Sequence, residues 1–123
     1  MAQIYWVHIP KEHTEGNELR DTDDGNPHAY VVVSRDSVNA NQHSVVGVPF
    51  TSRVQKANKT TRPLMKSTDF TPIGAIGEGD SVALCDHIRE VSIHRLDGPI
   101  GRTTKIGIAR IENAIAYLLD GST

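Results

Sequence analysis

The feature that most constrains the fold is a series of short apolar runs separated by turn-forming residues. Four runs rich in Val, Ile and aromatic residues predict β-strands: Ile4 to Ile9, Ala29 to Ser34, Ser44 to Phe50 and Ser81 to Cys85. Clusters of Gly, Asn, Asp and Pro lie between them and predict turns and loops. The sequence therefore predicts a mainly β fold, in which short strands form a small barrel.

Weaker signals complete the predicted elements. Arg62 to Lys66 and Ile88 to Ile93 are weaker strand candidates, and Ile73 to Asp80, with three glycines, predicts a loop. A C-terminal helix is indicated by apolar residues at 3-4-3 spacing, namely Ile108, Ile111, Ile115 and Leu118. This stripe is expected to pack one helix face against the barrel.

The ends of this helix carry their own signals. Thr103 or Thr104 can cap the start, and Gly121 can take the left-handed position at the end. Gly107, near the start, costs a helix about 1 kcal/mol relative to Ala. We therefore expect the helix to fray at its start or to begin one turn later.

Length and composition indicate one domain spanning residues 1–123. The chain has 123 residues and an apolar share of 37%, which suffices for one small core. Cys85 is the only cysteine, so no disulfide framework or zinc-type Cys/His cluster is expected, and a reducing cytoplasm fits best. We expect no metal or other cofactor. The N-terminus shows no leader pattern and no apolar run near the ~20 residues that span a bilayer, so we expect neither export nor membrane insertion.

The net charge of −2 hides two segments of opposite sign. Residues 12–24 contain six acids and one base, Arg20, whereas the segment from Arg53 to Lys66 contains five bases and no acid. Charged runs are usually solvated loops. The basic segment could instead contact the phosphates of a nucleic acid, which bind mainly through Lys and Arg.

Several motifs occur in an order that resembles the MazF/PemK family of bacterial toxins. They are IYWVHIP from Ile4, GNEL from Gly16, the stretch from Tyr30 to Ser52, GDSVALCDHIREV from Gly79, and IGR from Ile100. The resemblance implies an SH3-like barrel with a C-terminal helix. It also implies a cytoplasmic bacterial toxin of a type II toxin-antitoxin pair that forms a homodimer and is neutralised by an antitoxin with a largely disordered, acidic tail.

Toxins of this family are metal-independent endoribonucleases. A ribose 2′-hydroxyl of single-stranded mRNA attacks the adjacent phosphate, leaving a 2′,3′-cyclic phosphate and a 5′-hydroxyl. The reaction needs a base, an acid and donors to the phosphate. The resemblance implies that the basic residues bind RNA or the antitoxin: Arg53, Lys56, Lys59 and Arg62.

The resemblance also suggests individual catalytic residues. Thr51 stands where the family places a hydroxyl at the end of the third strand, and Ser52 follows it. Such a pair can equally end a strand by bonding its own backbone. His28 stands where the family has an arginine, and it can act as acid or base at neutral pH. Since about five extra residues precede His28, Arg20 is the reserve candidate.

Two acidic residues complete the predicted site. Asp86 matches a proposed general base of some relatives, although Leu84 replaces an arginine often found two residues earlier. Asp86 could instead bond to a turn or to Arg89, and on a strand it would point away from the face of His87. Glu18 matches a glutamate that orders a loop or touches substrate.

Two other readings remain open from the sequence. The replacements His28 and Leu84, with the enlarged acidic segment 12–24, fit a catalytically silent relative that binds RNA or antitoxin without cleavage. An SH3-like adaptor for proline-rich peptides is disfavoured, since aromatic residues make up only 5% of the chain. No motif in the chain indicates which RNA sequence is cut or what the acidic segment 12–24 does.

Overall fold

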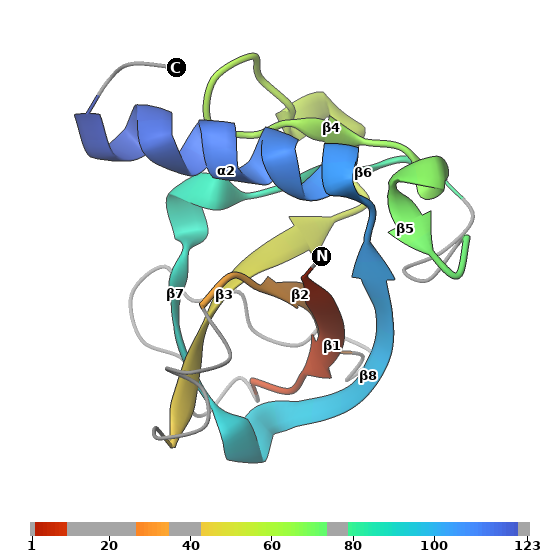
Figure 1. The fold of residues 1–123 in the computed structure, drawn as a ribbon, viewed down its shortest axis with the longest axis vertical. Coiled ribbons are helices and arrows are strands. Elements are labelled where there is room, and N and C mark those ends of the chain that lie inside the picture. Colours follow the sequence, from red (N-terminus) through yellow and green to blue (C-terminus); the bar gives the residue numbers. More distant parts are fainter. Residues whose placement is uncertain (1, 10–26, 35–42, 74–78, 121–123) are drawn as a thin grey trace.

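Eight strands and one long helix form within residues 2–9, 27–34, 43–73 and 79–120, the part of the chain that the computed structural model describes. The strands curl into an antiparallel half-barrel, and the helix lies across one end of it (Figure 1). The strands are β1 (Gln3–Val7), β2 (His28–Val32), β3 (Ser44–Thr51), β4 (Leu64–Met65), β5 (Phe70–Thr71), β6 (Ser81–Ala83), β7 (Arg89–Ser92) and β8 (Leu96–Thr103). The helix of these described ranges is α2 (Lys105–Asp120), and the 3₁₀ turns found there between strands are η2 (Val54–Lys56), η3 (Ser67–Asp69), η4 (Cys85–His87) and η5 (Ile93–Arg95).

Strand β3 organises the sheet, whose strand order is β4-β6-β3-β2-β1-β8-β5 with β7 also on β3. The first half of β3 pairs with β7, from Ser44↔Ser92 to Gly47↔Arg89. Its last residues pair with β6, at Phe50↔Ala83 and Thr51↔Val82. The eight residues of β3 therefore join β7, which pairs with its first half, to β6, which pairs with its end.

Alternation along β1, β2 and β3 divides the buried side chains between two clusters. Ala29 and Val31 belong to the larger cluster, which includes Ile111 and Ala114 of α2. Tyr30 and Val32 belong to the second cluster, on the other face of the same strands. Since successive residues of a strand point to opposite faces, the four residues from Ala29 to Val32 alternate between the two clusters.

Helix α2 begins at Lys105, so the expected start one turn later is wrong. The Thr104 hydroxyl accepts a hydrogen bond from the amide of Gly107 at 3.1 Å and caps the first turn. A Cβ at Gly107 would lie 2.9 Å from the carbonyl oxygen of Asp69. Close packing of the helix start on η3 therefore requires a glycine there, whatever its helix propensity.

The predicted apolar stripe of α2 is buried only in part. Ile111 is fully buried, and Ile108 and Ile115 pack against the larger cluster. Leu118 is 39% exposed, so the stripe ends one turn earlier than its spacing predicted. Gly121 lies outside the described residues.

Most predicted strands are confirmed, with shifted ends. The four main runs form β1, β2, β3 and β6, and Ile88 to Ile93 contains β7. The predicted strand Arg62 to Lys66 is reduced to β4, and Arg62 precedes it. Only the edges of the predicted loop Ile73 to Asp80 are described.

The prediction missed β5 and the long β8. Gly98, Pro99 and Gly101 suggest a turn, but they lie inside β8, which pairs with β1 around an irregular register between Ile4 and Trp6. Gly98 has a φ of +134°, a value that side-chain-bearing residues rarely adopt. A glycine therefore fits the irregularity without ending the strand.

Candidate functional site

His28 and Thr51 lie at the same end of one strand pair. Strands β2 and β3 pair antiparallel, with Tyr30 opposite Pro49 and Val31 opposite Val48. His28 begins β2 and Thr51 ends β3, so both residues lie at the same end of this antiparallel pair; the paired residues stop at Tyr30↔Pro49, and Thr51 itself pairs with Val82 of β6. Both side chains are half-buried. The structure thus brings two predicted site residues to one end of β2 and β3.

The hydroxyl of Thr51 also forms a hydrogen bond with the backbone just beyond the end of β3. Its Oγ1 accepts a hydrogen bond from the amide of Arg53 at 3.3 Å, and Ser52 between them is exposed. This is the backbone-bonding alternative that the sequence left open. It uses only the acceptor side of the hydroxyl, so the hydroxyl proton is still available to donate to a ligand.

Asp86 forms a two-pronged ion pair with Arg62. Nε of Arg62 lies 3.0 Å from Oδ1 of Asp86, and an Nη atom lies 2.7 Å from Oδ2. Bidentate pairs of this kind are stronger and more directional than single contacts. Asp86 lies in η4 and not on a strand, so the argument that Asp86 and His87 point to opposite faces does not apply.

The pair shifts the ionisation of both partners. The hydrogen bond from Arg62 is the main reason that the pKa of the Asp86 carboxyl falls below its ordinary value, partly opposed by burial. The same hydrogen bond raises the pKa of Arg62. Both groups therefore stay charged at neutral pH, and a lowered pKa makes Asp86 a weaker base.

Asn58 folds the basic segment, a role that the sequence analysis missed. Its Oδ1 accepts hydrogen bonds from the amides of Thr60, Thr61 and Arg62 at 3.0, 2.7 and 3.1 Å. A side-chain amide that gathers successive backbone amides is an Asx turn. The signal was present in the sequence as an Asn in a polar loop. This turn sets the backbone from which Arg62 reaches Asp86.

The bases of this segment differ in their partners. Arg62 pairs with Asp86, and Nζ of Lys66 lies 2.9 Å from Oδ2 of Asp80. Arg53, Lys56 and Lys59 are exposed and, among the described residues, have no ion-pair partner. Three cations are thus available on one stretch of surface beside Thr51.

The remaining predicted site positions add no side chain to the candidate site among the described residues. Glu18 and Arg20 lie outside the described residues. Leu84 is only 1% exposed, so in this chain that position belongs to the core and offers nothing to a ligand. In the described ranges, no group of three or more His, Cys, Asp or Glu side chains is placed to hold a metal ion. No helix there is long and apolar enough to cross a membrane.

Comparison with known proteins decides the family. The family model described as PemK-like, MazF-like toxin of type II toxin-antitoxin system matches residues 1–119. The chain belongs to this family. A search of curated proteins finds no match.

Solved structures confirm the fold of this PemK/MazF-like chain. A Mycobacterium tuberculosis toxin, MazF-mt6, superposes with a TM-score of 0.68 at 16% identity, covering 96% of each chain. An endoribonuclease in complex with its cognate antitoxin, from a mycobacterial species, gives a TM-score of 0.68 at 18% identity, covering 95% of this chain and 90% of that one. The SH3-like half-barrel with a C-terminal helix is therefore the fold of MazF-like toxins.

Proposed function

We propose that this chain is the toxin of a type II toxin-antitoxin pair and cleaves single-stranded RNA without a metal ion. The ribose 2′-oxygen attacks the adjacent phosphorus, the bond to the 5′-oxygen breaks, and a 2′,3′-cyclic phosphate and a 5′-hydroxyl result. Family membership supports the toxin class. The observation that supports the chemistry is that His28 begins β2 and Thr51 ends β3, at the same end of an antiparallel strand pair.

His28 and Thr51 have complementary roles in this proposal. His28 exchanges a proton with the 2′-oxygen or the leaving 5′-oxygen, a role that an imidazole can fill as acid or as base. Thr51 donates its hydroxyl proton to a phosphate oxygen, while its own oxygen is held by the Arg53 amide. Ser52 and Arg20 are further candidates for contact with the substrate phosphate.

Asp86 acts in the proposal mainly by holding Arg62. The ion pair lowers the pKa of Asp86 and so weakens it as the general base, while it fixes the guanidinium of Arg62 at the edge of the basic segment. We therefore assign proton transfer to His28 and a positioning role to Asp86.

The exposed cations Arg53, Lys56 and Lys59 bind the RNA backbone next to the cleaved bond. An antitoxin with an acidic tail would compete for the same cations, since carboxylates and phosphates share this chemistry. The related endoribonuclease solved with its cognate antitoxin supports such a partner. The toxin of this proposal is a homodimer in the bacterial cytoplasm, as membership of the family implies.

The test is cleavage of a long single-stranded RNA in EDTA. We expect the wild-type protein to cut, and the double variant Thr51→Ala, His28→Ala to lose at least 10²-fold in rate, the usual contribution of one general acid or base. Lys105→Gln, which removes an exposed charge from the start of α2, is the matched control and should cut normally. Equal cutting by the double variant would refute the assignment.

The presence of His28 in the place of the family arginine supports one alternative, a silent relative that binds without cutting. The two proposals differ in pH dependence. The rate of cleavage by general acid or base catalysis should vary with pH, whereas the affinity of a binding module should vary with salt concentration. RNA that stays intact at high protein concentration, yet is bound, would favour the silent relative.

A further inference from the structure

Three side chains form a diagonal line across β8, β1 and β2, which are neighbours in the sheet. Gln3 of β1 pairs with Arg102 of β8, and Val7 of β1 pairs with His28 of β2. Tyr5 lies between Gln3 and Val7, and alternation along β1 puts all three on one face. Paired residues share a face as well, so the line runs from Arg102 through Tyr5 to His28.

Tyr5 is a diagonal neighbour of both other members of the line. Diagonal neighbours on one face of an antiparallel pair are about 7–8 Å apart, within reach of aromatic and long side chains. The ring of Tyr5 is half-buried and packs against the second cluster. Its hydroxyl donates to Oε1 of Gln3 at 3.0 Å, which fixes the direction of the ring.

The irregular part of β8 leaves one side of this ring without a covering side chain. The register of β8 against β1 shifts between Ile4 and Trp6, opposite Tyr5. Gly98 lies there and is exposed, and a Cβ at this position would lie 3.5 Å from Cδ2 of Tyr5. Because glycine has no Cβ, a flat group such as a nucleotide base can approach the ring from this side.

Arg102 supplies a cation at the end of the line. It belongs to the IGR motif, which the proposed function has not used, and its side chain is exposed. Among the described residues it has no ion-pair partner. The nearby carboxylate of Asp97 starts from the other face, since Asp97 pairs with Trp6, which packs against the larger cluster. The charge beside Tyr5 on its own face is therefore positive.

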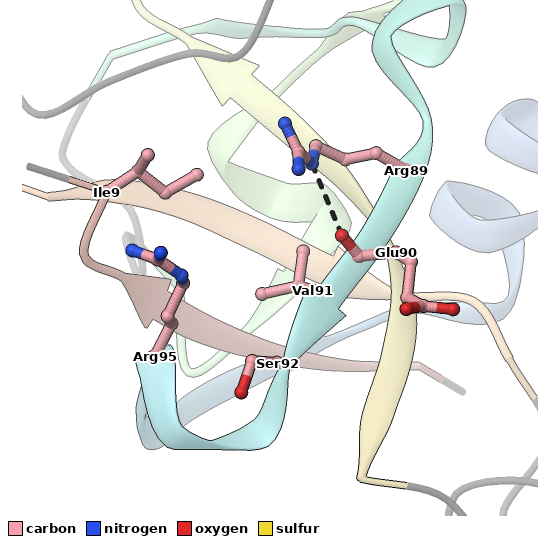
Figure 2. Close-up of a pocket in the computed structure, with 6 residues that line it drawn as sticks. All are labelled: Ile9, Arg89, Glu90, Val91, Ser92 and Arg95. Atoms are coloured by element: carbon pink, nitrogen blue, oxygen red, sulfur yellow. Dashed lines mark hydrogen bonds between the residues drawn. The ribbon is translucent and has the colours of Figure 1, made fainter. Parts of the chain in front are cut away.

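The arginines past the other end of β1 are engaged within the fold. Figure 2 shows Arg89 and Arg95 there, on β7 and η5. Arg89 donates from Nε to the carbonyl oxygen of Glu90 at 3.3 Å, and Arg95 donates from an Nη atom to that of His8 at 3.1 Å. Arg102 is thus the better candidate for a contact with an external anion.

We infer that a base of the RNA strand beside the cut bond stacks on Tyr5, and that Arg102 binds a backbone phosphate next to that base. The inference rests on the proposed function, which makes RNA the ligand and puts His28 at the cut. An aromatic ring can stack on any base, and a guanidinium fork matches a phosphate. The line thus offers one strand a proton-transfer group, a stacking surface and a cation in succession.

The experiment measures affinity without cleavage. The probe is a fully 2′-O-methylated RNA, which has no free 2′-hydroxyl to attack phosphorus, and its binding is titrated at several salt concentrations. Tyr5→Leu stays apolar but has no π face, so it should bind roughly tenfold more weakly with an unchanged salt dependence. Tyr5→Phe should bind like the wild type. Arg102→Gln should reduce the slope of log K against log salt by about 0.7, the value for one phosphate contact on a single strand.

Probes that each lack one base separate stacking from a structural role of Tyr5. At one position, removal of the base should weaken binding to the wild type and leave the affinity of Tyr5→Leu unchanged, because the ring that contacts this base is already missing. If Tyr5 only supports the fold, the loss from Tyr5→Leu and the loss from each missing base add at every position.

Matched variants control for charge and folding. Arg102→Lys keeps the charge and should keep the slope, and Lys105→Gln, which removes another exposed charge, should change neither affinity nor slope. Thermal unfolding of each variant shows whether it is folded. Should Tyr5→Leu not fold, Tyr5→Met takes its place, since it also has no π face, and the slope of Arg102→Gln tests the exposed end of the line separately.

The possible failures are distinguishable. If the proposed function is wrong, the wild-type protein itself neither cuts RNA nor binds the probe. If only the inference is wrong, the wild type cuts and binds, while Tyr5→Leu binds every probe like the wild type or shows additive losses throughout. An Arg102→Gln slope equal to that of Lys105→Gln would overturn the phosphate contact.

Discussion

The ion pair between Arg62 and Asp86 gives the most discriminating prediction. The two side chains are 27% and 30% exposed, so solvent screens them in part. Exposed pairs contribute about 0.2–1 kcal/mol, and the bidentate geometry places this pair at the upper end, at about 1 kcal/mol. Asp86→Asn should therefore lower the free energy of unfolding at pH 7 by about that amount, a fall of roughly 4 °C in Tm for a domain of this size.

The same pair decides what Asp86 does in catalysis. If Asp86 holds Arg62, then Asp86→Asn and Arg62→Gln lose similar RNA affinity, and the double variant loses little more than either single variant. A general base at Asp86 would instead cost 10²–10⁴ in rate in Asp86→Asn alone, a loss that Arg62→Gln does not share. The wild type, the two single variants and the double variant form a double-mutant cycle. For each of the four proteins we would measure the free energy of unfolding in urea, the affinity for RNA by titration and the single-turnover cleavage rate. Additive losses, or a rate defect confined to Asp86→Asn, would refute the positioning role.

Three further predictions concern the fold around the site. Gly107→Ala should destabilise the protein in urea denaturation although alanine favours helices, because its Cβ would lie 2.9 Å from the Asp69 carbonyl oxygen; a stabilised variant would contradict that packing. Burial raises the pKa of the Cys85 thiol to about 12, so alkylation at pH 8 should be undetectable in the native protein and rapid in urea. Because its pKa is lowered on folding, Asp86 stabilises the protein fully above the ordinary aspartate pKa of about 3.9, and this contribution is lost as the pH falls through the folded value. The difference in stability between wild type and Asp86→Asn should therefore shrink below about pH 4, and a constant difference down to pH 2 would argue against the pair.

Local patterns in the sequence were enough to find most of the fold. The runs that form β1, β2 and β3 alternate apolar side chains between two buried clusters, and the spacing of Ile108, Ile111 and Ile115 reports the buried side of α2. Strand β8 was missed because Gly98 and Pro99 suggest a turn. Only the pairing with β1 shows that they accommodate an irregular register.

The candidate site was harder to predict because its contacts join distant residues. Nothing in the spacing of Arg62 and Asp86 signals that they meet, since the contact depends on the Asx turn at Asn58 and on the path of η4. The sequence offered a turn or Arg89 as partners for Asp86, and the structure provides Arg62. The shared end of His28 and Thr51 follows from strand register, which a sequence specifies only through the folded sheet.

The measurement that tests the central claim most directly is the mapping of fragment ends from an RNA cut in EDTA, beside the same RNA with a single 2′-deoxy residue at the cut. Attack by the 2′-hydroxyl predicts 2′,3′-cyclic phosphate and 5′-hydroxyl ends, and no cleavage at the 2′-deoxy residue. Cleavage that tolerates the 2′-deoxy residue, or that yields 5′-phosphate ends, would contradict the account.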